Sequence, residues 1–408
     1  MQSFKIITFS ILWIKLTQKN FNEAHRLYGE DKNKKQISKK LGIERKTIIK
    51  WLNQTEYQDN RGWQKNKARK YTDKSIAEKI CSLKQNRIGN GSYFVGSPYV
   101  QMDFAKKHSE NEVPKLWYID KVVREAKLQT KVPKPKRKKG GSEYLLYPIK
   151  CIRQLGYVQQ SADFIGKKYI TGRSEPINIL SSSYYFPFKL YRIKRILAEK
   201  ATYAIETLTE QSQKYPIPDV FRMDNGLQWR GTASGKRAVG MMLRFLLNLK
   251  IIPLFGSPSK PWTNPHVEGH NRVFNDKVWN NNFFTGLEQI DQECGRFNKE
   301  SLELFEYKYS QLVFNGNFSY IKPRQEILTD RLMTAKGKKI YFIRFAESSC
   351  NSRKATIIIL NEIVYLPEKY NHQFVFVEWD IEKEQLCIYS EFKQEITLIY
   401  QTKFKLNI

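Results

Sequence analysis

Apolar side chains recur at helical spacing in residues 36–52. One apolar face, which includes Ile37, comes before Gly42, and a second face, which includes Trp51, comes after it. Gly42 therefore stands where a tight turn between two helices is needed. Two short helices joined in this way are typical of a helix-turn-helix, so we predict a DNA-binding domain of that kind over residues 1–58. An ordinary helical hairpin has the same pattern and stays open as an alternative.

A second helical region is predicted over residues 60–128. Amphipathic stretches at residues 75–83 and 114–125 flank a run of turn-forming residues at 88–92. A winged or helix-turn-helix variant and a plain helical spacer both fit this pattern, and the sequence leaves the two open.

The pattern changes to alternating strands and helices in residues 150–312. Strands are predicted over residues 157–165, 177–180, 184–191, 217–223 and 251–255, and helices over residues 194–214, 236–249, 266–279 and 288–312. This order favours an α/β layer built on a mixed sheet. Because Pro253 cannot donate to a neighbouring strand, we expect the strand that contains it to lie at an edge.

Residues 335–408 hold six short runs rich in β-branched and aromatic residues, with turn formers between them. Such a series predicts a small β-barrel. The expected fold class is therefore multidomain, with one or two N-terminal all-α helix-turn-helix modules, an α/β core and a C-terminal small β-barrel.

The chain of 408 residues carries 70 Lys and Arg against 40 Asp and Glu, a net charge of +30. With 41% hydrophobic residues it can form several folded domains, each with its own core. A basic excess of this size favours a polyanionic partner, above all nucleic acid. Most of the excess lies in residues 1–150, and a merely solvated, lysine-rich surface is the competing interpretation.

Residues 129–142 are predicted to be a basic linker. Its prolines favour an extended backbone, and a Gly-Gly pair provides a hinge. Four consecutive cations are candidates for contacts with DNA phosphates: Lys136, Arg137, Lys138 and Lys139. A nuclear localisation signal or a solvated charge run would look the same.

Several classes of protein are disfavoured. The five cysteines are widely separated and form no CxxC pair, which argues against a disulfide framework and a zinc finger. His266 and His270 have an i, i+4 spacing, but the glutamate does not directly follow the first histidine, so we interpret both as packing or DNA-proximal groups. The apolar run at residues 6–14 is too short to cross a bilayer and precedes no small-residue cleavage site, so we expect a buried helix or a misassigned start there. These features favour a cytoplasmic, nucleoid-associated protein without a membrane partner.

Three acidic residues stand at the ends of elements predicted in the α/β region. Asp163 lies in the first strand, Asp224 follows the strand over residues 217–223, and Glu268 opens the helix over residues 266–279. Each alone has an ordinary explanation, as a strand-end acid, a turn former or an acid that complements a helix dipole. Together, three carboxylates can hold two Mg²⁺ or Mn²⁺ ions, which prefer oxygen ligands. Such paired ions activate the attacking oxygen and stabilise the leaving oxygen at a phosphodiester.

The order of these motifs resembles the catalytic core of DDE transposases of the retroviral-integrase type, in particular the bacterial insertion-sequence branch with N-terminal helix-turn-helix modules. The matching segments are residues 161–166, 224–226 and 257–268. The resemblance covers about residues 35–320, and the β-rich tail is similar to the small barrel that follows the core in such proteins. The integrase-type His/Cys zinc module is absent from the sequence.

The resemblance implies a ribonuclease-H-like core, Mg²⁺- or Mn²⁺-dependent cleavage at transposon ends and strand transfer by a 3′-hydroxyl. It also implies that Asp163 and Asp224 share one ion and that Glu268 completes the site of a second. We therefore expect a DNA transposase whose partner is double-stranded DNA, both the terminal repeats of the element and the target. We also expect it to work as a homo-oligomer in a synaptic complex. A DNA-binding regulator or scaffold with an inactive core, and a structure-specific nuclease, are the alternatives.

Candidate DNA-contacting side chains lie on two predicted helices. On the second helix of the helix-turn-helix, which enters the major groove in such units, they are Arg45, Lys46, Thr47 and Lys50. In the core, the family often has a basic residue seven positions after the glutamate, where this chain has Asn275. Arg272, one helical turn beyond Glu268, and the nearby Lys277 are the candidates in its place.

Overall fold

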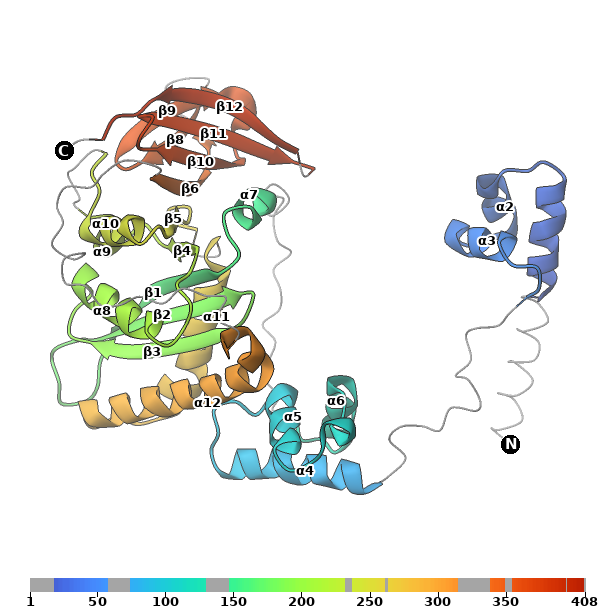
Figure 1. Cartoon of the computed structure of the whole chain (residues 1–408), viewed down its shortest axis with the longest axis horizontal. Coiled ribbons are helices and arrows are strands. Elements are labelled where there is room, and N and C mark those ends of the chain that lie inside the picture. Colours follow the sequence, from blue (N-terminus) through green and yellow to red (C-terminus); the bar gives the residue numbers. More distant parts are fainter. Residues whose placement is uncertain are drawn as a thin grey trace. The chain divides into compact units, whose positions relative to one another are not determined.

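The computed structural model describes residues 18–57, 74–129, 147–231, 237–260, 263–314, 338–348, 354–393 and 395–406 (Figure 1). The chain divides into two compact units, Met1–Asp73 and Lys74–Ile408. The apolar run at residues 6–14 and nearly all of the predicted linker, including its four consecutive cations, lie outside the described residues.

The first unit contains three packed helices. They are a helix through residues 18–29, α2 (Lys34–Leu41) and α3 (Arg45–Leu52). Phe21, Ile37 and Trp51 are buried in their common core. The turn between α2 and α3 begins at Gly42, whose φ of 64° lies in the left-handed region that glycine adopts without strain. The two helices and the turn predicted between them are therefore confirmed.

The second helical region consists of α4 (Lys74–Gly89), α5 (Ser97–Ala105) and α6 (Leu116–Glu125). The sequence did not predict α5. Its Val100 and Phe104 pack against α4 and α6, whereas Tyr99 and Met102 belong to a different core cluster. A helix with apolar residues on two sides does not show the one-sided apolar periodicity of an amphipathic helix, which explains why α5 was not predicted. Within residues 74–129 the structure describes no strand, so the winged alternative finds no support there.

A nine-stranded mixed sheet forms the centre of the second unit, in the order β12-β11-β10-β6-β5-β4-β1-β2-β3. β1 (Gln159–Lys168), β2 (Ile177–Phe186) and β3 (Leu190–Ile196) are successive antiparallel strands. β4 (Val220–Met223) and β5 (Ile252–Phe255) then continue the sheet parallel to β1. The predicted α/β layer on a mixed sheet is thus confirmed.

Some predicted boundaries are wrong. β2 runs without interruption through Ser181, Ser182 and Ser183, which lie between two predicted strands. These serines are buried, and two of them bond to buried side chains, as when the Ser182 hydroxyl donates to Gln211 at 3.0 Å. The helix predicted from residue 194 begins only at Ala201, because the preceding residues form β3.

Helices cover both faces of this sheet. On one face, α8 (Ala201–Ser212), the short α9 (Leu227–Arg230) and α10 (Met241–Asn248) share a core cluster with Phe164 of β1. On the other face, α11 (Pro265–Phe274), the turn of π-helix that follows it at Asn275–Trp279, and α12 (Leu287–Phe314) pack against Ile165. Successive residues of a strand point to opposite faces, so Asp163 faces the same side as Ile165, where α11 lies.

The C-terminal strands do not close into the small barrel that was expected. β6 (Lys339–Phe345) pairs parallel with β5, and β10 (Phe374–Asp380), β11 (Gln385–Phe392) and β12 (Glu395–Lys403) extend the same sheet antiparallel. β7 (Glu347–Ser348), β8 (Lys354–Ile359) and β9 (Glu362–Pro367) form a separate three-stranded sheet. Ile357 and Val364 of the small sheet pack in one cluster with Val375 and Val377 of the large one. The region is therefore two open sheets packed together, one of which continues the core.

β5 is an interior strand, not the edge strand that Pro253 led us to expect. Ile252 donates its N–H to the carbonyl of Asp219 at 2.8 Å, toward β4. The alternation along a strand therefore turns position 253 toward β6. Because β6 pairs with β5 only from Leu254 onward, the missing N–H of Pro253 falls before this ladder begins.

α12 covers β3, the strand at one edge of the large sheet. The Asn298 side chain accepts the N–H of Ile193 at 2.8 Å and donates to the carbonyl of Ile193 at 2.7 Å. The Ser301 hydroxyl accepts the N–H of Tyr191 at 3.1 Å. Helix side chains thus take the place of a further strand, and part of this edge is no longer open to pairing.

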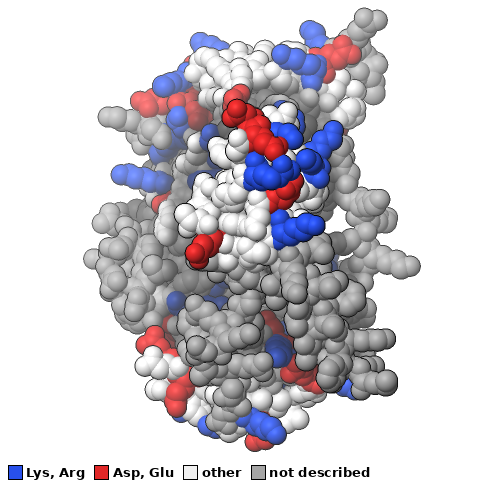
Figure 2. All heavy atoms as spheres, turned by 90° about the vertical axis from the view of Figure 1, so that its right-hand side faces the viewer, with Lys and Arg blue, Asp and Glu red and all other residues white. Residues whose placement is uncertain are grey.

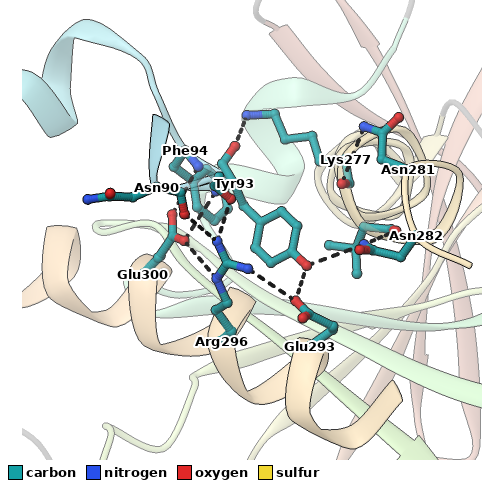
Figure 3. Close-up of polar contacts among 11 residues, drawn as sticks. Asn90, Tyr93, Phe94, Lys277, Asn281, Asn282, Glu293, Arg296 and Glu300 are labelled. Carbon is teal, nitrogen blue, oxygen red and sulfur yellow. Dashed lines mark hydrogen bonds and ion pairs between the residues drawn. The ribbon is translucent and has the colours of Figure 1, made fainter. Parts of the chain in front are cut away.

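Residues 90–95, which we call the docking segment, join the second helical region to α12 (Figure 3). The Glu300 carboxylate accepts the backbone N–H groups of Tyr93 at 3.1 Å and Phe94 at 3.0 Å. From the other side, Arg87 of α4 donates to the carbonyl of Phe94 at 3.0 Å. Further polar contacts of this junction join Arg296 to Asn90, Tyr93 to Glu293 and Lys277 to Tyr93. The docking segment is therefore held on both sides.

Candidate active site

Three structural elements bring the three predicted acids together near the middle of the large sheet, where β1 and β4 are interior strands. Asp163 lies in β1, Asp224 directly follows β4, and Glu268 lies in the first turn of α11. β1 and β4 are parallel neighbours, paired through Ser161 and Arg222, so their following residues emerge side by side. All three acids line one cleft of about 310 Å³. The cleft is otherwise lined by the turn after Asp224 and by the loop that connects β5 to α11.

Asp163 is the acid with the most strongly perturbed protonation. Its Oδ1 accepts the N–H of Phe164 at 2.8 Å, and its Oδ2 accepts the Asn271 amide at 3.3 Å. Burial, and then repulsion from Asp224 and Glu268, raises the pKa of Asp163 to about 8. The two hydrogen bonds oppose this shift without cancelling it.

The other two acids show the same trend more weakly. Burial raises the pKa of Asp224, against the effect of the Gly226 N–H that donates to its Oδ1 at 2.9 Å. Burial, followed by repulsion from Asp224, raises the pKa of Glu268. Three carboxylates that disfavour one another's ionised form would all be stabilised by a cation in the cleft.

The donor set suits a hard divalent cation, because every acidic group is a carboxylate and each keeps free oxygen lone pairs. Within the parts of the chain that the structure describes, however, no three His, Cys, Asp or Glu side chains are grouped so as to hold a metal ion as they stand. The acids therefore share a cleft without forming a finished coordination shell.

The described residues of the loop between β5 and α11 make polar contacts with one another. The Thr263 hydroxyl donates to the carbonyl of Lys260 at 2.7 Å and accepts the N–H of Ser257 at 3.0 Å. The Lys260 ammonium lies 3.9 Å from the centre of the Phe345 ring. Lys260 also lines the cleft, so it brings a positive charge to the edge of the acidic site. Trp262 lies outside the described residues.

The two histidines of α11 make packing contacts. His270 is buried, stacks on Tyr191 with 4.4 Å between ring centres, and shares a hydrogen bond of 2.8 Å with Ser181. Burial lowers the pKa of His270 to about 3, so its imidazole is neutral at physiological pH. The His266 ring stacks on Tyr185 at 4.1 Å. Their interpretation as packing groups fits these contacts.

The predicted DNA-contacting residues have different surroundings. On α3, the side chains of Arg45, Lys46 and Lys50 are exposed, and Thr47 is half-buried. The Arg272 side chain is 61% exposed and pairs only loosely with Asp276, at 3.4 Å. These positions leave room for a phosphate contact. On the face drawn in Figure 2, the Lys and Arg side chains of the described residues are interspersed with Asp and Glu.

Lys277 has other partners than those expected. Its ammonium donates to the carbonyl of Tyr93 and lies 5.0 Å from the centre of the Phe94 ring. Burial lowers its pKa. This lysine is therefore engaged by the docking segment (Figure 3), which makes it a poor candidate for a contact with DNA.

The structure adds residues that sequence reasoning missed. Asn271 stands three positions after Glu268, on the same side of α11, and that spacing was a usable signal. Asn225 donates to the carbonyl of Gly256 at 2.7 Å and so joins the ends of β4 and β5. Arg344 of β6 donates hydrogen bonds to both Asn225 and Gly256. It lies 120 positions beyond Asp224 in a region read as a separate domain, so no local pattern pointed to it.

Comparisons with known proteins give little further information. No protein-family model and no curated protein matches the sequence. Among solved structures, the chain is similar to one chain from the cryo-EM structure of the simian T-cell lymphotropic virus intasome in complex with PP2A regulatory subunit B56 gamma. The identity is 14% and the TM-score 0.30, over 67% of this chain and 96% of that chain. A likeness of this size establishes neither the fold nor the activity of this chain. Among the described residues, no helix combines the length and hydropathy needed to cross a bilayer.

Proposed function

We propose that this chain is a DNA transposase of the DDE type, which cleaves DNA at the ends of an element and joins them to target DNA. The observation that carries the proposal is the meeting of Asp163, Asp224 and Glu268 in one cleft, from two adjacent parallel strands and the helix that follows. The order of these acids along the chain and the motifs around them resemble those of DDE transposases.

In this proposal the cofactors are two Mg²⁺ or Mn²⁺ ions, held by Asp163, Asp224 and Glu268. When bound, such ions supply an activated attacking oxygen and a stabilised leaving oxygen at the phosphodiester. The chain itself would contribute the negative potential of the cleft and the hydrogen bonds that orient the carboxylates. The amide of Asn271 orients Asp163, and the N–H of Gly226 orients Asp224. The carboxylates would have to move together when they take up ions, since they do not form a coordination shell as they stand.

The first unit would recognise the terminal repeats. Helices α2 and α3 and the turn at Gly42 have the order of a helix-turn-helix, and α3 presents Arg45, Lys46 and Lys50 to solvent. A helix of this kind reads base edges in the major groove while cations nearby contact phosphates. Joining two element ends to a target requires more than one active site, so we expect a homo-oligomer on DNA.

A structure-specific nuclease and a DNA-binding regulator with an inactive core are the competing functions. A nuclease would cut DNA without joining it, and a regulator would bind ends without cutting them. The grouping of three half-buried carboxylates in one cleft favours a working site over an inactive one, because such mutual repulsion destabilises the folded chain and is found most often at functional sites.

The decisive experiment uses labelled duplexes taken from the DNA that flanks the coding sequence, with Mg²⁺ or Mn²⁺. We expect nicked ends and joined products from the native protein. The Asp224→Asn and Glu268→Gln variants should lose both products by on the order of 10⁴-fold, because these groups act as a unit. Glu288→Gln, a change at an exposed acid in the first turn of α12, is the matched control and should retain activity.

The outcomes separate the three functions. Cleavage without joined products would indicate the nuclease. Binding of the end DNA with no metal-dependent cleavage by the native protein would contradict the transposase and indicate the regulator or scaffold.

A further inference from the structure

Arg344 of β6 is a buried cation close to the acidic cleft. The residue is 4% exposed, and no ion pair joins it to a carboxylate among the described residues. Burial, with a smaller effect from Arg230, lowers its pKa to about 9. A buried guanidinium without a counter-ion is costly, so its hydrogen bonds indicate what it is retained for.

Two of these bonds reach the turns that line the cleft. Nη2 donates to the Asn225 side-chain oxygen at 2.8 Å, and Nη1 donates to the carbonyl of Gly256 at 2.8 Å. The Asn225 amide donates to the same carbonyl at 2.7 Å, which closes a triangle of polar groups. Asn225 and Gly256 both line the cleft. Arg344 therefore ties together the ends of β4 and β5 from behind the site.

Each of these turns leads to a predicted catalytic acid. Asn225 directly follows Asp224, whose carboxylate accepts the N–H of Gly226 in the same turn. Gly256 opens the loop that continues to Glu268 in α11, and its own N–H donates to the carbonyl of Met223 at 2.9 Å. A shift of either turn would therefore move a carboxylate.

The other bonds of Arg344 fix the guanidinium itself. Nε donates to the carbonyl of Ile358 in β8 at 2.7 Å, and Nη1 also donates to the carbonyl of Ile343 at 2.9 Å. The planar fork of arginine can hold these acceptors in several directions at once, whereas the single ammonium of lysine cannot span them. Strands of the large sheet and of the small sheet thus both hold the guanidinium of Arg344 in place.

We propose that Arg344 is a positioning residue for the three-acid site, and that the C-terminal strands are in this way a part of the active site. The inference deepens the proposed function and rests on it. Arg344 acts through Asn225 and Gly256, which it holds in the geometry that aims Asp224 into the cleft and sets the start of the loop before Glu268. It does not itself contact the DNA or the ions.

The test compares Arg344→Met with Arg230→Met in the full-length protein. Arg230 is the matched control because it also joins the core to the small sheet, with Nη1 2.8 Å from the Asn361 side-chain oxygen, but does not line the cleft. The first readout is hydrogen exchange at the Gly226 and Gly256 amides, which needs neither metal nor DNA. Loss of a charged hydrogen-bond donor should accelerate this exchange by roughly tenfold or more.

The second readout is Mn²⁺ binding, measured by electron paramagnetic resonance. We expect about tenfold weaker binding in Arg344→Met, partial recovery in Arg344→Lys and no change in Arg230→Met. Unchanged amide exchange at Gly226 and Gly256 in Arg344→Met, relative to Arg230→Met, would overturn the proposal. If Arg344→Met does not fold, Arg344→Lys takes its place, since it keeps the charge but loses the fork that spans Asn225 and Gly256, and the same two amides decide the outcome.

The two proposals can fail separately. If the native protein cleaves no DNA but the amide exchange responds to Arg344→Met as expected, the transposase assignment fails and the positioning role stands. If cleavage is observed and the amides do not respond, the transposase stands and Arg344 is only a packing residue.

Discussion

At the scale of single residues, the candidate site is defined by charge. Asp163 is held mostly away from water and faces two other carboxylates, so its ionised form is disfavoured in the folded chain. The unfolded chain imposes no such cost. The stability of the protein without metal should therefore depend on pH through this residue.

The sign of this dependence follows from the two pKa values of Asp163, about 8 when folded and about 4 when unfolded. Between these values the folded state binds the extra proton, so this contribution to stability is present at pH 4 and is lost as the pH rises to 8. We predict that Asp163→Asn raises the unfolding temperature of the metal-free protein by several degrees at pH 9 and has little effect at pH 5. Thermal unfolding at both pH values measures this, and an equal shift at both would contradict it.

At the scale of elements, α12 has a central structural role. Its side chains occupy part of the free edge of β3, and its carboxylate at Glu300 holds the docking segment. Both contacts are hydrogen bonds between side chains of α12 and backbone groups of other elements. The second helical region and the large sheet should consequently move as one body.

This coupling can be tested with Glu300→Ala. The change leaves the backbone N–H groups of Tyr93 and Phe94 without their acceptor, which should cost about 1–3 kcal/mol of local stability. We predict faster hydrogen exchange in residues 90–95. The control is Glu303→Ala, one turn along α12, which breaks only the exposed ion pair to Lys106 at 3.2 Å and should cost under about 1 kcal/mol. Equal exchange in both variants would show that Glu300 does not hold the docking segment.

At the scale of the whole molecule, the large sheet joins parts that the sequence suggested were separate domains (Figure 1). β6 pairs with β5, and the apolar residues of both sheets belong to one cluster with Phe221 and Trp229. The first unit, by contrast, has its own small core. Removal of the first unit and removal of the C-terminal strands should therefore have different effects on the folding of the rest of the chain.

We predict that a fragment of residues 74–408 folds and retains the cleft of Asp163, Asp224 and Glu268, while it loses the binding of element ends that the proposed function assigns to the first unit. A fragment of residues 74–337 should not fold, because it removes β6, the neighbour of β5 on the side away from β4, and exposes the apolar core that β6 and β10 cover. Circular dichroism and thermal unfolding of both fragments measure this. A cooperative transition in the shorter fragment would show that the C-terminal strands form an independent domain after all.

Part of this fold could be predicted from the sequence because its signals are local. The turn at Gly42, the helices on both sides of it, the strand that carries Asp163 and the strand before Asp224 all follow from periodicity and turn chemistry over a few residues. The sequence also placed three acids at the ends of neighbouring elements. That was enough to predict a common site, which the shared cleft now supports.

Other features depend on partners that are distant in the chain. The buried serines of β2 look like turn formers until the bond between Ser182 and Gln211 is known. Pro253 looks like an edge residue until the stagger between β5 and β6 is known. The sequence predicts Lys277 as a DNA contact, but its ammonium bonds to the docking segment.

The sequence by itself determined which residues carry charge, where the two helices around Gly42 form and in what order the acids occur, because these depend on local chemistry. Only the tertiary structure decided that the C-terminal strands continue the core sheet and that Arg344 reaches the turn after Asp224. The pairing of two strands and the burial of a cation are settled by the free energy of the whole packed unit, to which residues far apart in the chain contribute together.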